Sequence, residues 1–210
     1  MQSHAERNGD HRRKSCQVAH RRVSRTSQVS EPTNGLSDLL GANVIKVDIA
    51  NEQSNHVFEV ELLQEAVRIV LAGEAVTEGD VSVAIVDDAT IHVLNRKYLE
   101  HDYATDVLSF LLSTPGEPLE GEVIVSADTA AREGVRFGWT DVDELLLYVV
   151  HGTLHLVGYD DRSDSERATM RAKESQYLRA LGRQPIEKDS DSTTCTLPSS
   201  QPPIQGKATS

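Results

Sequence analysis

The sequence predicts an α+β fold: a small mixed sheet of about four strands packed with about five helices, in a single domain with disordered tails. Short stretches of alternating apolar residues indicate the strands, and longer stretches with apolar residues three or four apart indicate the helices. Both ends of the chain are polar and offer little to bury, which is typical of disordered segments. We therefore place the folded domain at residues 44–183, an ordinary length for one domain.

The first half of the domain alternates strands with helices. Residues 44–49 alternate like a strand, and residues 57–72 then carry apolar side chains at helical spacing. A second strand is predicted over residues 80–86 and a second helix over residues 88–99. The domain is thus expected to open with two β–α units.

The second half contributes two more strands and then only helices. Residues 107–112 and 122–126 are apolar enough for strands, and the Pro- and Gly-containing residues 115–118 predict a turn between them. Gly182 is expected to cap the last helix. The remaining helices are predicted over residues 127–137, 141–157 and 163–181.

Charge is distributed unevenly along the chain. The formal net charge is −12, yet residues 1–30 carry seven Lys or Arg residues against two acidic ones. Residues 1–43 are therefore predicted to form a disordered basic N-terminal arm, and residues 184–210 a disordered C-terminal tail. An organelle transit peptide is a less favoured interpretation of the arm, because its acidic residues and its lack of an apolar face are unusual in such peptides.

The overall composition excludes several classes of protein. An acidic net charge argues against a protein that coats nucleic acids or membranes through a basic surface. Cys16 and Cys195 lie near opposite ends of the chain, so neither a disulfide framework nor a thiolate metal site is expected. The apolar runs are much shorter than the roughly 20 residues that cross a bilayer. We expect a cytoplasmic protein without membrane contact.

The clearest chemical signal lies where the last two predicted helices meet. His151 and His155 are four residues apart on a helix, so both imidazoles project from one face and can reach a single ion. Gly158 can end the helix in the left-handed conformation and bring Asp160 or Asp161 back toward the same ion. The spacing from His151 to Asp161 is that of a three-ligand zinc-binding run, which favours Asp161 as the third ligand.

Two other interpretations of this run are open. A histidine pair in an apolar helix can be a hydrogen-bonded core pair, although a shared cation explains better why two polar rings are buried together. Metalloproteases use the same spacing, but they need a Glu directly after the first histidine as general base, and this chain has Gly152 there. A different kind of metal hydrolase is therefore favoured.

The run H-G-T-L-H-L-V-G-Y-D-D at residues 151–161 is accompanied by a second block of motifs. This block consists of LNRKY at residues 94–98, TDVLSF at residues 105–110 and GEVI at residues 121–124. Together the two blocks resemble the YbeY family of endoribonucleases, which act in bacterial ribosomal RNA maturation and whose signature is similar to H-G-x-L-H-L-x-G-Y-D-H. The resemblance spans about residues 44–181 and implies a metal-dependent endoribonuclease domain there.

Two departures from the family pattern bear on the chemistry. The family supplies a third histidine where this chain has Asp161, and an anionic ligand reduces the effective charge of zinc, so Mn²⁺ and Mg²⁺ become better competitors. The family usually has an Arg, a natural phosphate clamp, where this chain has Leu99. Arg96 lies one helical turn earlier and is our candidate to replace it. Asp106 is the candidate second acid or base, or equally a residue that caps a strand end.

The resemblance implies a single-strand-specific, metal-dependent endoribonuclease in which a metal-activated water attacks an RNA phosphodiester. One zinc ion would be held by His151, His155 and Asp161, with Mn²⁺ or Mg²⁺ as alternatives. The implied role is late-stage ribosome maturation, including small-subunit rRNA 3′-end processing and ribosome quality control. The implied partners are rRNA, the small ribosomal subunit and assembly factors. The alternative is a non-catalytic RNA or ribosome-assembly factor with a structural metal; another metal hydrolase, such as a peptidase, ranks last.

Overall fold

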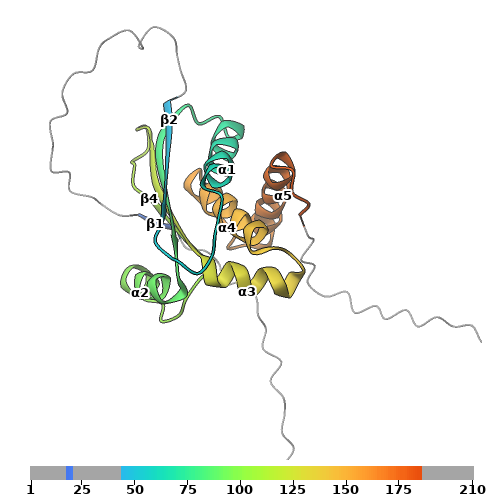
Figure 1. Cartoon of the computed structure of the whole chain (residues 1–210). Helices are drawn as coiled ribbons and strands as arrows, with labels where there is room; N and C mark the ends of the chain where they lie inside the picture. Colours follow the sequence, from blue (N-terminus) through green and yellow to red (C-terminus); the bar gives the residue numbers. More distant parts are fainter. Residues whose placement is uncertain (1–17, 21–43, 186–210) are drawn as a thin grey trace, which may run out of the picture.

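A mixed five-stranded β-sheet lies at the centre of the fold (Figure 1) in the computed structural model, which describes residues 18–20 and 44–185. The strand order is β1-β4-β5-β3-β2. The pairs β1–β4, β2–β3 and β3–β5 are parallel, whereas β4 and β5 are antiparallel neighbours. The strands are β1 Val18–His20, β2 Val44–Asn51, β3 Glu78–Val86, β4 Val107–Leu111 and β5 Leu119–Ser126.

Helices pack on both sides of this sheet. Figure 1 shows α1, α4 and α5 on one side and α2 on the other, with α3 packed against α4. Successive side chains of a strand point to opposite faces, so β4 contributes to the hydrophobic core on each side of the sheet. Val107 belongs to the larger core under α1 and α4, and Leu108 belongs to the smaller core under α2. The helices are α1 Val60–Gly73, α2 Asp88–Leu99, α3 Ala127–Phe137, α4 Asp141–Leu156 and α5 Asp164–Ala180.

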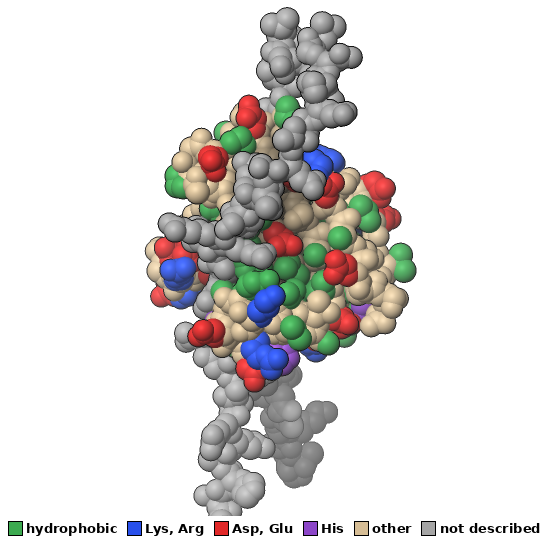
Figure 2. Space-filling view, turned by 90° about the vertical axis from the view of Figure 1, so that its left-hand side faces the viewer, with side chains coloured by type: hydrophobic (Ala, Val, Ile, Leu, Met, Phe, Trp, Pro, Cys, Tyr) green, Lys and Arg blue, Asp and Glu red, His purple; other side chains and the backbone are tan. Residues whose placement is uncertain are grey.

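The sheet face under α2 is only partly covered by helix. Figure 2 shows this side of the molecule, where hydrophobic side chains are visible near the centre with acidic and basic side chains among and around them. The hydrophobic residues that are only partly buried against this smaller core are Ala84, Leu94, Tyr98, Leu99, Ala104 and Leu112.

The central helix α4 lies very close to the sheet because of one glycine. A Cβ atom on Gly152 would lie 2.6 Å from Val123 Cγ1 and 3.0 Å from Ser109 Oγ, so only glycine fits without a shift of the neighbours. The Ser109 hydroxyl donates a hydrogen bond of 3.1 Å to the Gly152 carbonyl and joins α4 to β4. Gly152 thereby sets the distance from the sheet at which the neighbouring His151 is held.

Both helices that frame the α4–α5 connection begin with a side-chain cap. At the start of α4, Thr140 Oγ1 accepts a hydrogen bond of 3.1 Å from the Asp143 N–H. At the start of α5, Ser163 Oγ accepts from the Glu166 N–H, and the Glu166 carboxylate accepts from the Ser163 N–H in return, which is a capping box. The box makes α5 begin at a defined residue and keeps the connection after α4 short.

The predicted fold class is confirmed, with four strands and five helices close to the expected residues. The strands β3 and β5 begin two and three residues earlier than predicted, because each continues its pairing with a neighbouring strand. The short strand β1 was not predicted and falls within the residues assigned to the arm; it pairs with the outer edge of β4, whose backbone groups would otherwise lack a strand partner. The other residues of the predicted tails, 1–17, 21–43 and 186–210, lie outside the described residues.

Membrane insertion was not expected from the sequence. Among the helices in the described part of the chain, none combines the length and the apolar character that a membrane crossing requires.

Candidate metal centre

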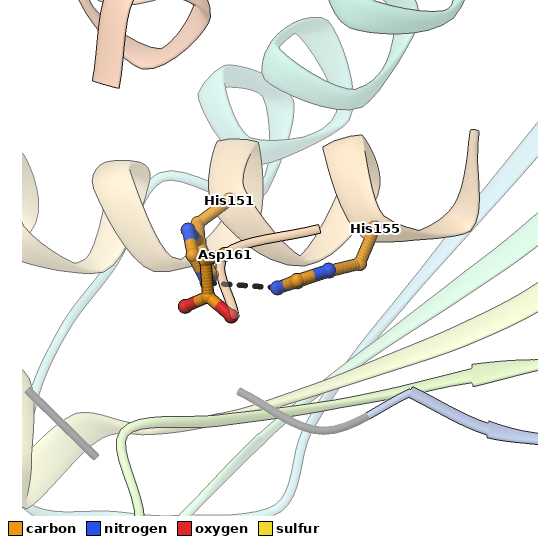
Figure 3. Close-up of side chains that lie close together, drawn as sticks. All are labelled: His151, His155 and Asp161. Atoms are coloured by element: carbon orange, nitrogen blue, oxygen red, sulfur yellow. Dashed lines mark hydrogen bonds between the residues drawn. The ribbon is translucent and has the colours of Figure 1, made fainter. Parts of the chain in front are cut away.

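The three residues predicted as metal ligands come together at the end of α4. His151 and His155 lie on consecutive turns of this helix, and Asp161 follows it after a short turn at Gly158. One ligand atom from each of the three side chains lies within 4.8 Å of the other two. Figure 3 shows the His155 ring directed toward His151 and Asp161. These three residues, here called the metal group, also lie at the C-terminal end of α4, where the helix dipole favours a cation.

The hydrogen bonding of His155 determines which nitrogen it presents. Its Nδ1 lies 2.8 Å from the Tyr159 carbonyl oxygen, which can only accept, so Nδ1 carries the hydrogen. Burial and the neighbouring His151 lower the pKa of His155 to about 4, so this ring is neutral at pH 7. A neutral ring protonated on Nδ1 has its lone pair on Nε2, which is the form that binds a metal.

His151 is oriented by a carboxylate from the last helix. Its Nδ1 lies 2.7 Å from Oε1 of Glu174, and both side chains are largely buried. The Glu174 oxygen accepts the Nδ1 hydrogen, so the lone pair of the neutral His151 ring lies on Nε2. The Nε2 atoms of His151 and His155 face each other at 3.1 Å, so this contact needs a proton or a cation to be favourable.

Asp161 supplies the observation that favours a cation over a shared proton. The residue is 9% exposed, and its Oδ1 is buried without a hydrogen-bond partner among the described residues. Burial raises the pKa of this carboxyl, because the charged form loses its hydration there. A divalent cation between two imidazole nitrogens and this oxygen would supply the missing partner, and that ligand set fits zinc. The residues present therefore fit a metal ion.

Comparison with known proteins identifies the family of this chain. The family model described as "Endoribonuclease YbeY" matches residues 29–182. A protein of that name from Rhodopirellula baltica is 44% identical over 135 residues, covering 63% of this chain and 69% of the relative. This chain belongs to the YbeY endoribonuclease family.

Two further proteins named as YbeY endoribonucleases are similar to this chain over most of their own length. The YbeY endoribonuclease of Salinibacter ruber is 38% identical over 64% of this chain and 91% of its own. That of Geobacillus thermodenitrificans is 36% identical over 66% of this chain and 97% of its own. A solution structure of a Thermotoga maritima protein is 29% identical with a TM-score of 0.49, covering 64% of this chain and 88% of that one.

Asp106, the candidate acid or base, lies at the start of β4. Its Oδ1 accepts hydrogen bonds of 3.0 Å from Thr105 Oγ1 and from the Val107 N–H. This is the arrangement expected of a residue that caps a strand end. It does not belong to the three-residue metal group, so its catalytic role in this YbeY family member stays a prediction.

Arg96, the candidate phosphate clamp, lies on α2 with a side chain that is 64% exposed. Its Nη1 is 3.9 Å from the Asp102 carboxylate, which is an exposed ion pair and therefore weak. The partner of Arg96 is thus Asp102, in the loop after α2, and not a residue of the metal group. The role of Arg96 as a phosphate clamp also stays a prediction.

Asp160 and Gly152 have positions that explain two features of the YbeY signature. The Asp160 carboxylate accepts from the Asp161 N–H at 2.8 Å, so it shapes the turn that delivers Asp161. Gly152 is packed against β4 and β5, where a Cβ atom has no room. The residue after His151 therefore faces the sheet rather than the metal group, which leaves no place there for the general base of a metalloprotease.

The residues that orient the two histidines were not identified from the sequence. Glu174 carried one usable signal: it lies four residues from both Met170 and Leu178, on the buried stripe of α5. An acidic residue on such a stripe needs a buried partner, which here is His151. The role of Tyr159 is performed by its backbone carbonyl and left no signal in the sequence.

Proposed function

We propose that this chain is a metal-dependent endoribonuclease that cleaves single-stranded RNA. The observation that carries the proposal is the group of His151, His155 and Asp161 in a member of an endoribonuclease family. It combines two opposed Nε2 atoms with a carboxylate oxygen that has no hydrogen-bond partner among the described residues. RNA is the substrate class implied by the name of the family.

His151, His155 and Asp161 are the residues proposed to hold the ion, with zinc favoured by the two imidazoles. The carboxylate of Asp161 makes Mn²⁺ and Mg²⁺ stronger competitors than they would be at a three-histidine site. A bound divalent ion supplies Lewis-acid chemistry, namely activation of water and stabilisation of negative charge on a phosphodiester. Elemental analysis of protein purified without a chelator identifies the ion.

Two further residues are proposed to assist at the substrate. Asp106 would act as acid or base. For this, its Oδ1 would have to give up the hydrogen bond from the Thr105 hydroxyl and contact the substrate or a water molecule instead. Arg96 would bind a phosphate by giving up its exposed ion pair with Asp102, which costs little because such pairs contribute little.

The proposed biological role is maturation of ribosomal RNA in the cytoplasm. It includes processing of the 3′ end of small-subunit rRNA, with the small ribosomal subunit and assembly factors as partners, and a part in ribosome quality control. The support for this role is family membership together with the signature at residues 151–161.

A cleavage assay on the purified full-length chain tests the enzymatic proposal. We expect it to cut a single-stranded RNA, to leave the same sequence in a duplex intact, and to lose activity with a chelator. The variant His151→Ala should lose both the metal and the cleavage, because it removes one of three proposed ligands. Cleavage that survives this substitution would come from a contaminating nuclease and would remove the support for the proposal.

The second candidate is an RNA-binding or ribosome-assembly factor with a structural metal. The observation that favours it is the engagement of both assisting residues elsewhere: the Asp106 carboxylate caps β4 and Arg96 pairs with Asp102. Binding and cleavage of the same RNA, measured side by side, separate the two candidates. Binding that depends on the metal group, without cleavage, would support this second function.

A further inference from the structure

A partly buried carboxylate outside the metal group accepts three hydrogen bonds from two other parts of the chain. Glu74 follows the last residue of α1. Its Oε1 accepts from Lys173 Nζ at 2.6 Å and from the Tyr177 hydroxyl, both on α5. Its Oε2 accepts from the Tyr159 hydroxyl at 2.9 Å, in the connection between α4 and α5. One carboxylate therefore ties three segments together.

Glu74 and its three partners Tyr159, Lys173 and Tyr177 form a charged cluster, the Glu74 cluster, that is largely screened from solvent. The side chain of Glu74 is 14% exposed and that of Lys173 is 27% exposed. Burial raises the pKa of Glu74, but hydrogen bonds from Lys173, Tyr177 and Tyr159 outweigh it, so the net pKa lies below its usual range and the group is ionised. The Lys173 ammonium also lies 5.3 Å from the centre of the Tyr159 ring, where a cation–π interaction is favourable.

The close approach of Tyr177 to this cluster depends on Gly73. A Cβ atom on Gly73 would lie 2.5 Å from the Tyr177 hydroxyl oxygen. Glycine at the end of α1 therefore allows the phenol to reach the Glu74 carboxylate. A larger residue at position 73 would displace the Tyr177 ring and disturb this arrangement.

Tyr159 connects this cluster to the metal group. Its phenol is held by Glu74, and its backbone carbonyl accepts the Nδ1 hydrogen of His155 at 2.8 Å. The chain turns sharply just before it, since Gly158 has a φ of 99°. The turn at Gly158 restrains the backbone of Tyr159, and Glu74 holds the end of its side chain. Together these two restraints fix the position of the Tyr159 carbonyl.

We propose that Glu74 is a positioning residue for the metal centre, acting through Tyr159 on His155. By holding the Tyr159 phenol it keeps the carbonyl against Nδ1 and the metal-binding lone pair on Nε2. The last helix braces both histidines at once, because Lys173 holds Glu74 while the adjacent Glu174 holds His151. This inference rests on the proposed metal site of the preceding section.

The test compares two phenylalanine substitutions at the same carboxylate, both in the full-length chain. Tyr159→Phe removes the link to the metal centre, and Tyr177→Phe removes a link to α5 only. Zn²⁺ affinity is measured with a chromogenic competitor, and the tautomer of His155 is read from ¹⁵N chemical shifts of the imidazole ring in metal-free protein. We expect Tyr159→Phe to weaken Zn²⁺ binding about tenfold, as outer-shell changes do, and to mix the two His155 tautomers.

The matched variant Tyr177→Phe should lower the unfolding temperature and leave Zn²⁺ affinity and tautomer unchanged. Glu74→Gln is the second variant and should act like Tyr159→Phe, because a neutral amide holds the phenol less strongly. Equal weakening of Zn²⁺ binding by both tyrosine variants, or no effect of Tyr159→Phe, would overturn the inference. If the wild-type chain binds no Zn²⁺, the proposed metal site fails, but the tautomer measurement still decides whether Glu74 positions His155.

Discussion

Two hydrogen bonds made outside the proposed metal site decide which nitrogens the two histidines present to it. Nδ1 of His151 is held by the Glu174 carboxylate and Nδ1 of His155 by the Tyr159 carbonyl. Both rings thereby direct Nε2 into the same small volume, where the two atoms are 3.1 Å apart. At the scale of single residues, metal affinity is therefore expected to depend on hydrogen-bond partners as well as on ligands.

The variant Glu174→Gln is expected to weaken metal binding by about tenfold. The amide keeps the size of the side chain but replaces a charge-assisted hydrogen bond to His151 with a neutral one, and the basicity of Nε2 falls. A competition titration with Zn²⁺ measures the effect, and Glu65→Gln on the exposed face of α1 is the control for a lost negative charge. An affinity equal to that of the wild type would show that Glu174 serves only to fill the core.

Single residues differ in how far the sequence reveals them. The clustering of His151, His155 and Asp161 was predictable because their spacing is a property of one continuous stretch of chain. Glu74 was not, since its contact with Tyr159 joins residues 85 positions apart and exists only after the end of α1 packs against the connection between α4 and α5. The sequence left the role of Asp106 open between catalysis and capping, and its hydrogen bonds match the capping role.

At the scale of elements, periodic segments were predicted well and short edge segments were not. α4 and α5 combine helical periodicity with capping residues, so both their type and their extent follow from local sequence. β1 has three residues and pairs in parallel with the outer edge of β4, with Val18 opposite Ser109 and His20 opposite Leu111. Such a strand depends on an available partner, which no local pattern encodes.

The contact between α4 and the sheet makes Gly152→Ala a test of how the fold positions the site. The added methyl group would lie 2.6 Å from Val123 Cγ1, so the helix or the strand must move. We expect a loss of about 1–3 kcal/mol in the free energy of unfolding, typical of an overpacked core. Because His151 is the preceding residue, Zn²⁺ affinity should also fall. Urea denaturation and metal titration measure the two effects; an unchanged stability would mean that this contact relaxes at no cost.

At the scale of the whole molecule, the charge distribution separates the domain from the arm. Residues 44–183 carry 12 Lys or Arg residues against 26 Asp or Glu residues, whereas residues 1–30 carry seven basic residues against two acidic ones. On the face shown in Figure 2, acidic and basic side chains are interspersed rather than gathered into a basic surface. General attraction of phosphates by the domain is therefore expected to be weak, and RNA affinity should come from the metal group and from the arm.

This division of charge predicts how RNA binding responds to salt. Each arginine that contacts a phosphate adds about 0.7 to the slope of log affinity against log salt for a single strand, because it releases bound counterions. Replacing the six arginines of residues 1–30 with Gln, in the full-length chain so that Val18–His20 is kept, should flatten that slope. The same six positions changed to Lys keep the charge and should leave the slope unchanged.

Binding is measured with a single-stranded RNA and a chelator, so that no cleavage occurs. A slope that is the same for the Gln and Lys variants would assign the electrostatic part of RNA binding to the acidic domain alone, against this prediction. The arginines are Arg7, Arg12, Arg13, Arg21, Arg22 and Arg25.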